Sequence, residues 1–241
     1  NWGGLSDVAR SIQTQRGLGA SKVSAPSVGG TINIVTRNLD AKKGGFLSYG
    51  MGNDGMNKIL FSVSSGITKN GWAFTLMGGK NWGNGYIQGT AFEGYNWFAS
   101  ISKRINEEHQ LTLTAFGAPQ WHDQRNSSYG GLTIADWKMV ETVYGVKDHK
   151  YNPTFGYRSN GESYNSYRNS YHKPLISLNH QWQINSKSSL STSLYVSLGR
   201  GSGFSGQGNT EFSPYSYTSW RGAYKGTLYD TFRRSDGTFD Y

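Results

Sequence analysis

Residues 189–198 read SLSTSLYVSL, and this stretch indicates the fold class. Leucine or valine occupies positions 190, 194, 196 and 198, while serine or tyrosine occupies positions 189, 191, 193, 195 and 197. Successive side chains of a strand point to opposite faces, so a period of two predicts a strand rather than a helix. The stretch therefore predicts a β-strand with one apolar face and one small, polar face.

The same alternation recurs along the chain. Including residues 189–198, the predicted strands occupy residues 45–51, 57–67, 72–80, 95–104, 109–117, 173–184 and 189–198. Strands of about ten residues are the length that a tilted strand needs to cross a membrane. The sequence thus favours a transmembrane antiparallel β-barrel.

The connections between these strands alternate in length. If the strands run up and down, the connections at 69–71, 106–108 and 185–188 share one end, and all are tight turns. Of the connections at the other end, the one at 53–55 is short and the others are long loops at 82–91, 118–172 and 199–241. Short turns on one rim and long loops on the other are typical of outer-membrane barrels. Within the longest loop, residues 133–144 predict a helix that Thr133 caps and Gly145 ends.

Composition excludes several classes of protein. The 241 residues include 35 Phe, Trp and Tyr but only 16% charged residues, which argues against disorder. Cysteine is absent, so disulfides and thiolate metal sites are excluded. No apolar run reaches the ~18 residues of a membrane-spanning helix. Five tryptophans fall near ends of predicted strands, as an interfacial girdle requires, at positions 72, 82, 97, 121 and 182.

The first 40 residues carry a different pattern. Residues 12–17 predict a short strand that ends at a turn glycine, and Gly29-Gly30 opens a second strand through residue 36. Paired glycines permit a positive φ or the close approach of another backbone.

These residues resemble the end of the plug domain of TonB-dependent outer-membrane receptors. The resemblance rests on Arg16-Gly17 and on Gly29-Gly30-Thr31-Ile32-Asn33-Ile34-Val35-Thr36, with eleven residues between them. Leu18 stands where the family has proline, and Ala25-Pro26 replaces its usual Tyr-Gly. The plug-motif residues are thus Arg16, Gly17, Gly29, Gly30, Ile32 and Asn33. By the resemblance, Arg16 pairs with an acidic residue of the barrel or plug, and Gly29 and Gly30 allow close approach to the barrel wall.

The resemblance also implies an architecture. Barrels of this family close 22 strands around a plugged lumen, and seven strands leave edges that lipid cannot satisfy. We therefore expect a fragment, with residues 1–40 as the C-terminal part of the plug and residues 41–241 as the first seven barrel strands with their extracellular loops.

Enzymatic motifs are weak or missing. His109, His122, His149, His172 and His180 show no metal-ligand spacing, and the His122-Asp123 pair reads as a polar loop dipeptide. No Gly-x-Ser-x-Gly elbow or phosphate loop occurs. The sequence thus predicts a protein that is not an enzyme, without catalytic residues, a resident metal or a cofactor.

The basic residues are dispersed. The net charge is +9, and the cations at 42, 43, 147, 150, 158, 168, 233 and 234 fall in turns and loops, which disfavours nucleic acid. They are either ordinary solvated charge or contacts for lipopolysaccharide phosphates or an anionic substrate.

The long loops hold the candidate binding residues, because aromatic rings supply stacking area while amides and guanidinium groups fix orientation. A surface lipoprotein that caps the loops would use the same residue types. The candidates are Trp82, Tyr86, Trp121, His122, Arg125, Tyr151, Tyr157 and Arg158.

The function that the resemblance implies is TonB-dependent uptake of a scarce nutrient across the bacterial outer membrane. TonB with its proton-driven motor, the ligand and outer-membrane lipid are the implied partners. Ferric siderophore is the first expectation for the cargo, with cobalamin, haem and oligosaccharide as alternatives. A passive porin or adhesin-type barrel and a soluble carbohydrate-binding β-sandwich remain the alternative functions.

Overall fold

The computed structural model describes residues 9–16, 29–36, 42–125, 134–204 and 233–241. One helix, α2 (Ile134–Tyr144), and fifteen strands are found in these parts of the chain. The strands of the largest sheet are β3 (Gly44–Met51), β4 (Asn57–Ser64), β5 (Trp72–Gly83), β6 (Phe92–Arg104), β7 (His109–Gly117), β8 (Gln120–Asp123), β11 (Arg168–His172), β12 (Leu175–Asn185), β13 (Ser188–Ser197) and β14 (Arg200–Phe204). The smaller strands are β1 (Ala9–Arg16), β2 (Gly30–Thr36), β9 (Phe155–Tyr157), β10 (Ser163–Asn165) and β15 (Phe239–Asp240).

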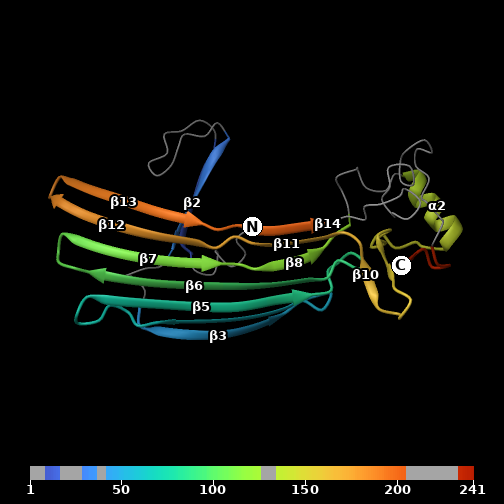
Figure 1. The fold of residues 1–241 in the computed structure, drawn as a ribbon, viewed down its shortest axis with the longest axis horizontal. Coiled ribbons are helices and arrows are strands. Elements are labelled where there is room, and N and C mark those ends of the chain that lie inside the picture. The colour runs from blue at the N-terminus through green and yellow to red at the C-terminus, as the bar shows by residue number, and fades with distance from the viewer. Residues whose placement is uncertain (1–8, 17–28, 37–41, 126–133, 205–232) are drawn as a thin grey trace.

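The ten-stranded sheet contains every predicted strand. Its main path runs β13-β12-β7-β6-β5-β4-β3, and every pair of neighbouring strands on this path is antiparallel. Neighbours in the sheet are also neighbours in the chain, except that β7 is followed by β12. β8 and β11 continue the sheet beyond β7 and β12, and β14 pairs with β11. The prediction of seven strands is confirmed, and Figure 1 shows them side by side as long, nearly parallel ribbons.

β14 falls within the expected loop 199–241 and pairs with β11. The range 118–172, which we expected to be loop except for its helix, is partly sheet as well. Its first and last segments form β8 and β11, which pair with each other. Both strands consist mainly of polar residues (QWHD in β8 and RNSYH in β11), so they lack the alternation of apolar and polar side chains by which strands are predicted. The predicted helix is present as α2, and Gly145 follows it with φ 67°. Thr133, its expected cap, lies outside the described residues.

Two faces of the sheet differ in chemistry. The register aligns Leu47, Phe61, Gly78, Trp97 and Gly117 in one row across β3 to β7. The face that carries this row, here called the apolar face, also holds exposed side chains such as Phe74, Leu76, Ile101, Leu113, Ile176, Leu178, Leu194 and Val196.

The opposite, polar face carries hydroxyl and amide groups. Ser100 and Ser102 are buried there and meet Thr114 and Thr112 of β7, with oxygen–oxygen distances of 3.4 and 3.0 Å. A small apolar cluster lies on the same face and consists of Leu60, Met77, Phe98 and Phe116. The sheet thus has the alternation of a barrel wall, with apolar groups outward and polar groups inward.

The ends of the sheet are unequal, as the connection lengths predict. The turns before β5, β7 and β13 lie together at one end, and α2 with β10 and the C-terminal residues lies at the other (Figure 1). Asn106 closes one turn by accepting hydrogen bonds from the backbone N–H groups of Glu108 and His109. Asn185 closes another in the same way with Lys187 N–H.

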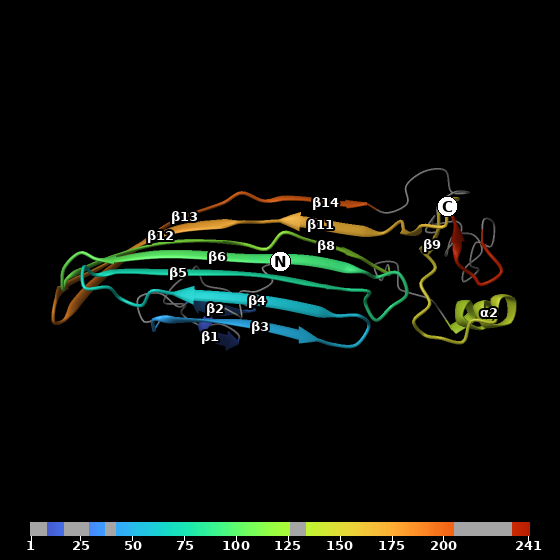
Figure 2. The same cartoon turned by 90° about the horizontal axis from the view of Figure 1, so that it is seen from below.

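The N-terminal segments form a separate two-stranded sheet. β1 pairs antiparallel with β2, from Arg16 opposite Gly30 to Ala9 opposite Thr36. Gly30 has φ 114°, a conformation that favours glycine. Figure 1 shows β2 rising past the level of β12 and β13, on the far side of the sheet from β3, and Figure 2 shows the hairpin from below. Among the described residues no helix is long and apolar enough to cross a membrane.

Candidate ligand-binding rim

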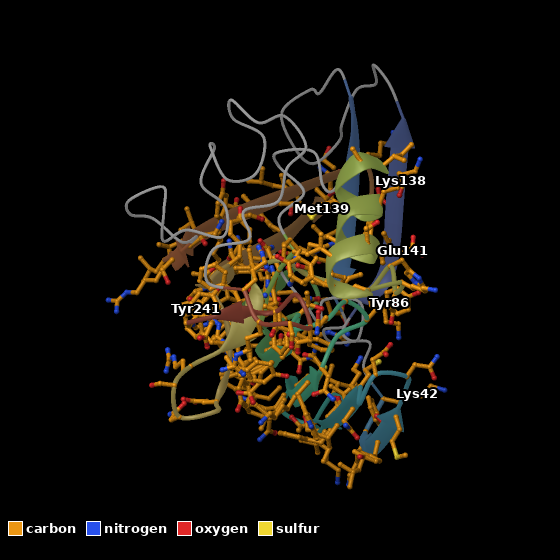
Figure 3. The ribbon with its side chains drawn as sticks, turned by 90° about the vertical axis from the view of Figure 1, so that its right-hand side faces the viewer. Lys42, Tyr86, Lys138, Met139, Glu141 and Tyr241 are labelled. Carbon is orange, nitrogen blue, oxygen red and sulfur yellow. The ribbon has the colours of Figure 1, made fainter. Side chains whose placement is uncertain are left out.

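The rim with the long connections carries a folded unit, here called the cap. It consists of α2, the connection 84–91, the segment 145–166 and the C-terminal residues 233–241, with β10, β9 and β15 as its small sheet. β15 runs parallel to β9, so the chain end returns to a segment about eighty residues earlier. Figure 3 looks onto this end and shows α2, with Lys138, Met139 and Glu141 labelled, beside Tyr86, and Tyr241 across the cap.

Tyr151 is at the centre of the cap. It is only 2% exposed and packs with fully buried Val140 and with Trp137, whose ring centroid is 6.3 Å away. Its hydroxyl donates to Gly237 O at 2.8 Å and accepts from Arg233 Nη1 at 3.2 Å. Burial raises the pKa of Tyr151 to about 12 because the phenolate would lose its hydration, although the charge of Arg233 lowers it.

Buried amides join the connections of the cap. Asn152 is fully buried, donates to Gln88 O at 2.9 Å, and accepts from Thr154 Oγ1 at 2.7 Å. Asn165 donates to Gly89 O at 2.7 Å. These bonds satisfy backbone carbonyls that would otherwise be unpaired, which explains why the connection 84–91 and the segment 145–166 form one folded unit.

Two predicted binding residues serve this framework. Tyr151 is buried as described, and Arg125 Nη1 donates to the carbonyls of His149 and Tyr151 at 2.9 and 3.0 Å. The Tyr151 hydroxyl is enclosed and bonded within the cap, and a role of Tyr151 in ligand binding stays a prediction. Sequence patterns do not separate a buried loop tyrosine from an exposed one.

The remaining loop candidates divide into two groups. Tyr86 is exposed on the cap, with its hydroxyl 2.5 Å from His149 Nε2 and Lys150 Nζ 4.6 Å from its ring centroid. Tyr157 and Arg158 lie on and beside β9, where the guanidinium groups of Arg234 and Arg158 stack on Tyr157 and Tyr164 at 4.9 and 4.4 Å. Trp82, Trp121 and His122 instead lie on β5 and β8 of the large sheet, so the structure does not gather the candidates at one point.

A cavity of about 350 Å³ adjoins Tyr86 on the cap. Its walls include Asn84 and Gln88 from the connection 84–91, Asp148 and Lys150, and Asp54 from the turn after β3. Lys150 Nζ lies 3.5 Å from Asp54 Oδ1. Asp236, also on the wall, is desolvated, but hydrogen bonds from Thr238 N–H and Oγ1 and the charge of Arg234 outweigh this and lower its pKa. The cavity offers amide, carboxylate and ring surfaces to a polar ligand.

Charged and aromatic side chains form a belt on the apolar face near the cap. Lys80 Nζ lies 3.0 Å from Glu93 Oε2 and about 5 Å from the ring centroids of Trp82 and Tyr95. Arg168 makes two hydrogen bonds to Asp123, at 2.6 and 2.9 Å, and stacks on Trp121 at 4.2 Å. We call this set, from β5 to β11, the cap-side belt.

A second belt occupies the turn end of the same face. Lys103 Nζ lies 5.0 Å from the ring centroid of Trp72, and Trp182 stacks on His109 at 5.3 Å. Glu93 and Lys103 are ten positions apart on β6. At about 3.4 Å per residue and a strand tilt of about 40°, this corresponds to a height of about 26 Å, close to the ~25 Å apolar band of outer-membrane barrels.

One side-chain pair was not foreseen from the sequence. His109 Nδ1 and His180 Nε2 lie 3.0 Å apart although the residues are 71 positions apart in the chain. Their ring planes are nearly parallel, at 5°, with the centroids 5.2 Å apart, and the distance between the two nitrogens is that of a hydrogen bond. Only the register of β7 against β12 brings them together.

The plug-motif residues lie on the β1–β2 hairpin where they are described. Arg16 faces Gly30 in the register, and Ile32 and Asn33 lie opposite Thr14 and Gln13. An added Cβ at Gly29 would meet no described heavy atom within 4 Å, and the expected close approach to the barrel wall stays a prediction. Gly17 and the side chain of Arg16 lie outside what the structure describes, and the expected ion pair of Arg16 remains a prediction.

A single sheet with an apolar band between two aromatic belts, a polar opposite face and unequal ends defines the wall of an outer-membrane β-barrel. The chain has the fold of part of a TonB-dependent receptor of this class, as the sequence predicts.

The structural likeness extends over most of the chain. The ferric-catecholate import receptor Fiu of E. coli K12 matches with a TM-score of 0.63 and 13% identity, over 80% of this chain and 29% of that one. The siderophore receptor PiuA of Acinetobacter baumannii matches with a TM-score of 0.59 and 15% identity, over 80% and 26%. The ferric citrate transporter FecA in its unliganded form matches with a TM-score of 0.61 and 21% identity, over 83% and 28%.

In sequence, the vitamin B12 transporter BtuB of Vibrio vulnificus (strain CMCP6) is 24% identical over 119 residues, which are 46% of this chain and 19% of that protein. No protein-family model matches the chain. The chain thus spans less than a third of each named relative, and these relatives are receptors and transporters rather than enzymes.

Proposed function

We propose that the chain forms part of an outer-membrane receptor that imports a scarce nutrient by TonB-dependent active transport. The observation that carries the proposal is a barrel-wall sheet preceded by a hairpin with the Gly-Gly-x-Ile-Asn-Ile sequence. In this proposal residues 1–40 end the plug, residues 41–241 begin the barrel, and the cap faces the cell exterior. The resemblance to receptors and transporters for siderophores, ferric citrate and vitamin B12 supports this function.

The proposed mechanism needs no covalent chemistry. The ligand binds at the cap and plug from outside, and TonB, powered by the inner-membrane proton gradient, remodels the plug so that the ligand passes. Ferric siderophore is the first candidate cargo, with cobalamin, haem and oligosaccharide next. Among the described residues of the cap, exposed Tyr86 and Arg158 and the cavity beside Tyr86 are accessible to a ligand.

The test is uptake by the full-length receptor in cells with and without TonB, using labelled ferric siderophores, cobalamin, haem and an oligosaccharide. We expect one cargo class to enter only with TonB, and Tyr86→Ala to weaken its binding. Lys187→Ala, in the exposed turn before β13, is the matched control and should bind normally. Equal uptake without TonB would reject the transporter and favour a passive porin.

A further inference from the structure

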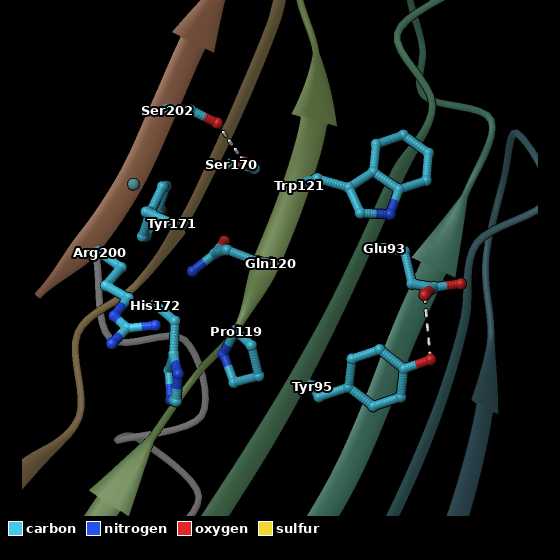
Figure 4. A pocket seen from close by; sticks show the side chains of 11 residues that line it. Glu93, Tyr95, Pro119, Gln120, Trp121, Ser170, Tyr171, His172, Arg200 and Ser202 are labelled. Carbon is cyan, nitrogen blue, oxygen red and sulfur yellow. Dashed lines mark hydrogen bonds between the residues drawn. The ribbon is translucent and has the colours of Figure 1, made fainter.

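A pocket on the apolar face lies beside the cap-side belt rather than on the cap. It has a volume of about 530 Å³ and is formed by β6, β8, β11 and β14. Figure 4 shows Arg200 and His172 at one side of the pocket and Trp121, Glu93 and Tyr95 at the other. The register places Glu93, Trp121, Ser170 and Ser202 in one row across these strands.

The position of the pocket limits its occupant. Below the belt the same face carries exposed Ile176 and Val196, which are opposite each other on β12 and β13. If this face meets the bilayer, as the proposed function implies, the pocket opens at the height of the lipid headgroups, where aromatic side chains gather. The molecules that reach it are therefore amphiphiles with a polar head at the pocket and acyl chains along the apolar face.

The charges of the pocket favour an anionic head. Glu93 is already neutralised by Lys80 at 3.0 Å and accepts from the Tyr95 hydroxyl at 3.0 Å. Arg200 is exposed, and its guanidinium has no ion pair or hydrogen bond among the described residues. A guanidinium presents a planar fork of donors that matches a phosphate. The hydroxyls of Ser170 and Ser202, 3.0 Å apart, line the same pocket two positions away along the strands.

His172 adds a second observation at the same wall. It pairs directly with Arg200 in the register, and its ring stands edge-on against Trp97 at 6.3 Å. Its Nε2 is buried and has no hydrogen-bond partner among the described residues. This nitrogen lies over Gly117, beside Trp97, and neither residue lines the pocket, so His172 contributes its ring rather than this nitrogen to the wall.

We propose that this pocket binds the phosphate of an outer-leaflet membrane lipid, with Arg200 as its main ligand and Ser170, Ser202 and His172 around it. The proposal names residues for a lipid contact and rests on the proposed membrane orientation of the apolar face. The bound lipid fills the pocket beside β14 and covers the apolar side chains below it.

The experiment is native mass spectrometry of the full-length receptor in mild detergent, with a phosphorylated outer-leaflet glycolipid and its dephosphorylated form as probes. The variants are Arg200→Ala, Arg200→Lys and, as the matched control, Arg104→Ala on the polar face at the turn end of β6. A charged hydrogen bond contributes about 1.5–3 kcal/mol, so we expect Arg200→Ala to lower the affinity for the phosphorylated lipid about tenfold or more. Arg200→Lys should retain part of it and Arg104→Ala all of it.

Equal binding of both lipid forms, or an equal loss in Arg200→Ala and Arg104→Ala, would overturn the proposal. Phosphatidylglycerol is tested as a third probe. If Arg200→Ala weakens the binding of phosphatidylglycerol but not of the glycolipid, the pocket binds a different lipid and the outer-leaflet source is rejected. Nutrient uptake is measured on the same variants: TonB-dependent uptake with unchanged lipid binding rejects the lipid site alone, whereas TonB-independent uptake rejects the transporter alone. Circular dichroism and resistance to unfolding by heat in detergent confirm that each variant is folded.

Discussion

The substitution Tyr151→Phe should reverse its effect on stability between neutral and strongly alkaline pH. At neutral pH it removes a hydroxyl that donates to Gly237 O and accepts from Arg233 Nη1. These two partners stay bonded to each other at 3.0 Å, so the loss is limited to about 1 kcal/mol. The ring and its contact with Trp137 are kept.

The alkaline effect has the opposite sign. Burial raises the pKa of Tyr151 from 10.0 to about 12, so folding favours the neutral phenol. The stability from this group is complete below about pH 10 and is lost as the pH rises from about 10 to about 12, a total of about 2.7 kcal/mol for two pKa units. Phenylalanine does not ionise, so above pH 12 the variant should be more stable than the wild type by about 1.7 kcal/mol.

Two measurements check this reasoning on the purified full-length protein in detergent. The difference between the ultraviolet phenolate titrations of wild type and variant should show one tyrosine with a midpoint near pH 12. Thermal unfolding of the cap, followed by near-ultraviolet circular dichroism, should rank the variant below the wild type at pH 8 and above it at pH 12. A midpoint near pH 10, or the same ranking at both pH values, would refute the buried position of Tyr151. Tyr241, whose pKa burial also raises to about 12, is present in both proteins and cancels in the comparison.

Further predictions concern packing and faces. Phe98→Ala empties a site that is 1% exposed in the apolar cluster of the polar face, and should lower the free energy of unfolding by about 3–5 kcal/mol in thermal or denaturant melts. Asn152→Ala leaves buried carbonyl and hydroxyl groups unpaired at a cost of about 1–3 kcal/mol, which hydrogen exchange in residues 84–91 should report as faster opening. Gly156→Ala would place its Cβ against Phe239 O and should detach β15, which new protease cleavage near the C-terminus would detect. The control Gly50→Ala, whose Cβ would meet no atom within 4 Å, should not create this cleavage. Leu113→Arg, on the apolar face, should cost about 2–4 kcal/mol in a bilayer and reduce the fraction of heat-resistant, membrane-assembled protein, and normal assembly would contradict the assignment of that face to lipid.

The sequence alone determined the wall of this protein. Alternation in stretches such as SLSTSLYVSL depends only on local geometry, because a strand turns every second side chain to the same face. For the same reason the positions of the seven predicted strands, the short turns at one end and the helix that ends at Gly145 follow from local signals, whereas β8, β11 and β14 did not. Arg16-Gly17 and the glycine pair at residue 29 likewise indicated the family before any contact was known.

Only the tertiary structure decided which side chains meet. Tyr86 and Tyr151 look alike in the sequence, yet one is exposed on the cap and the other is enclosed by Val140 and Trp137. The pocket at Arg200 exists because β14 pairs with β11 and β11 with β8, which joins residues some eighty positions apart. Burial and charge pairing depend on such long-range registers, and no local pattern encodes them.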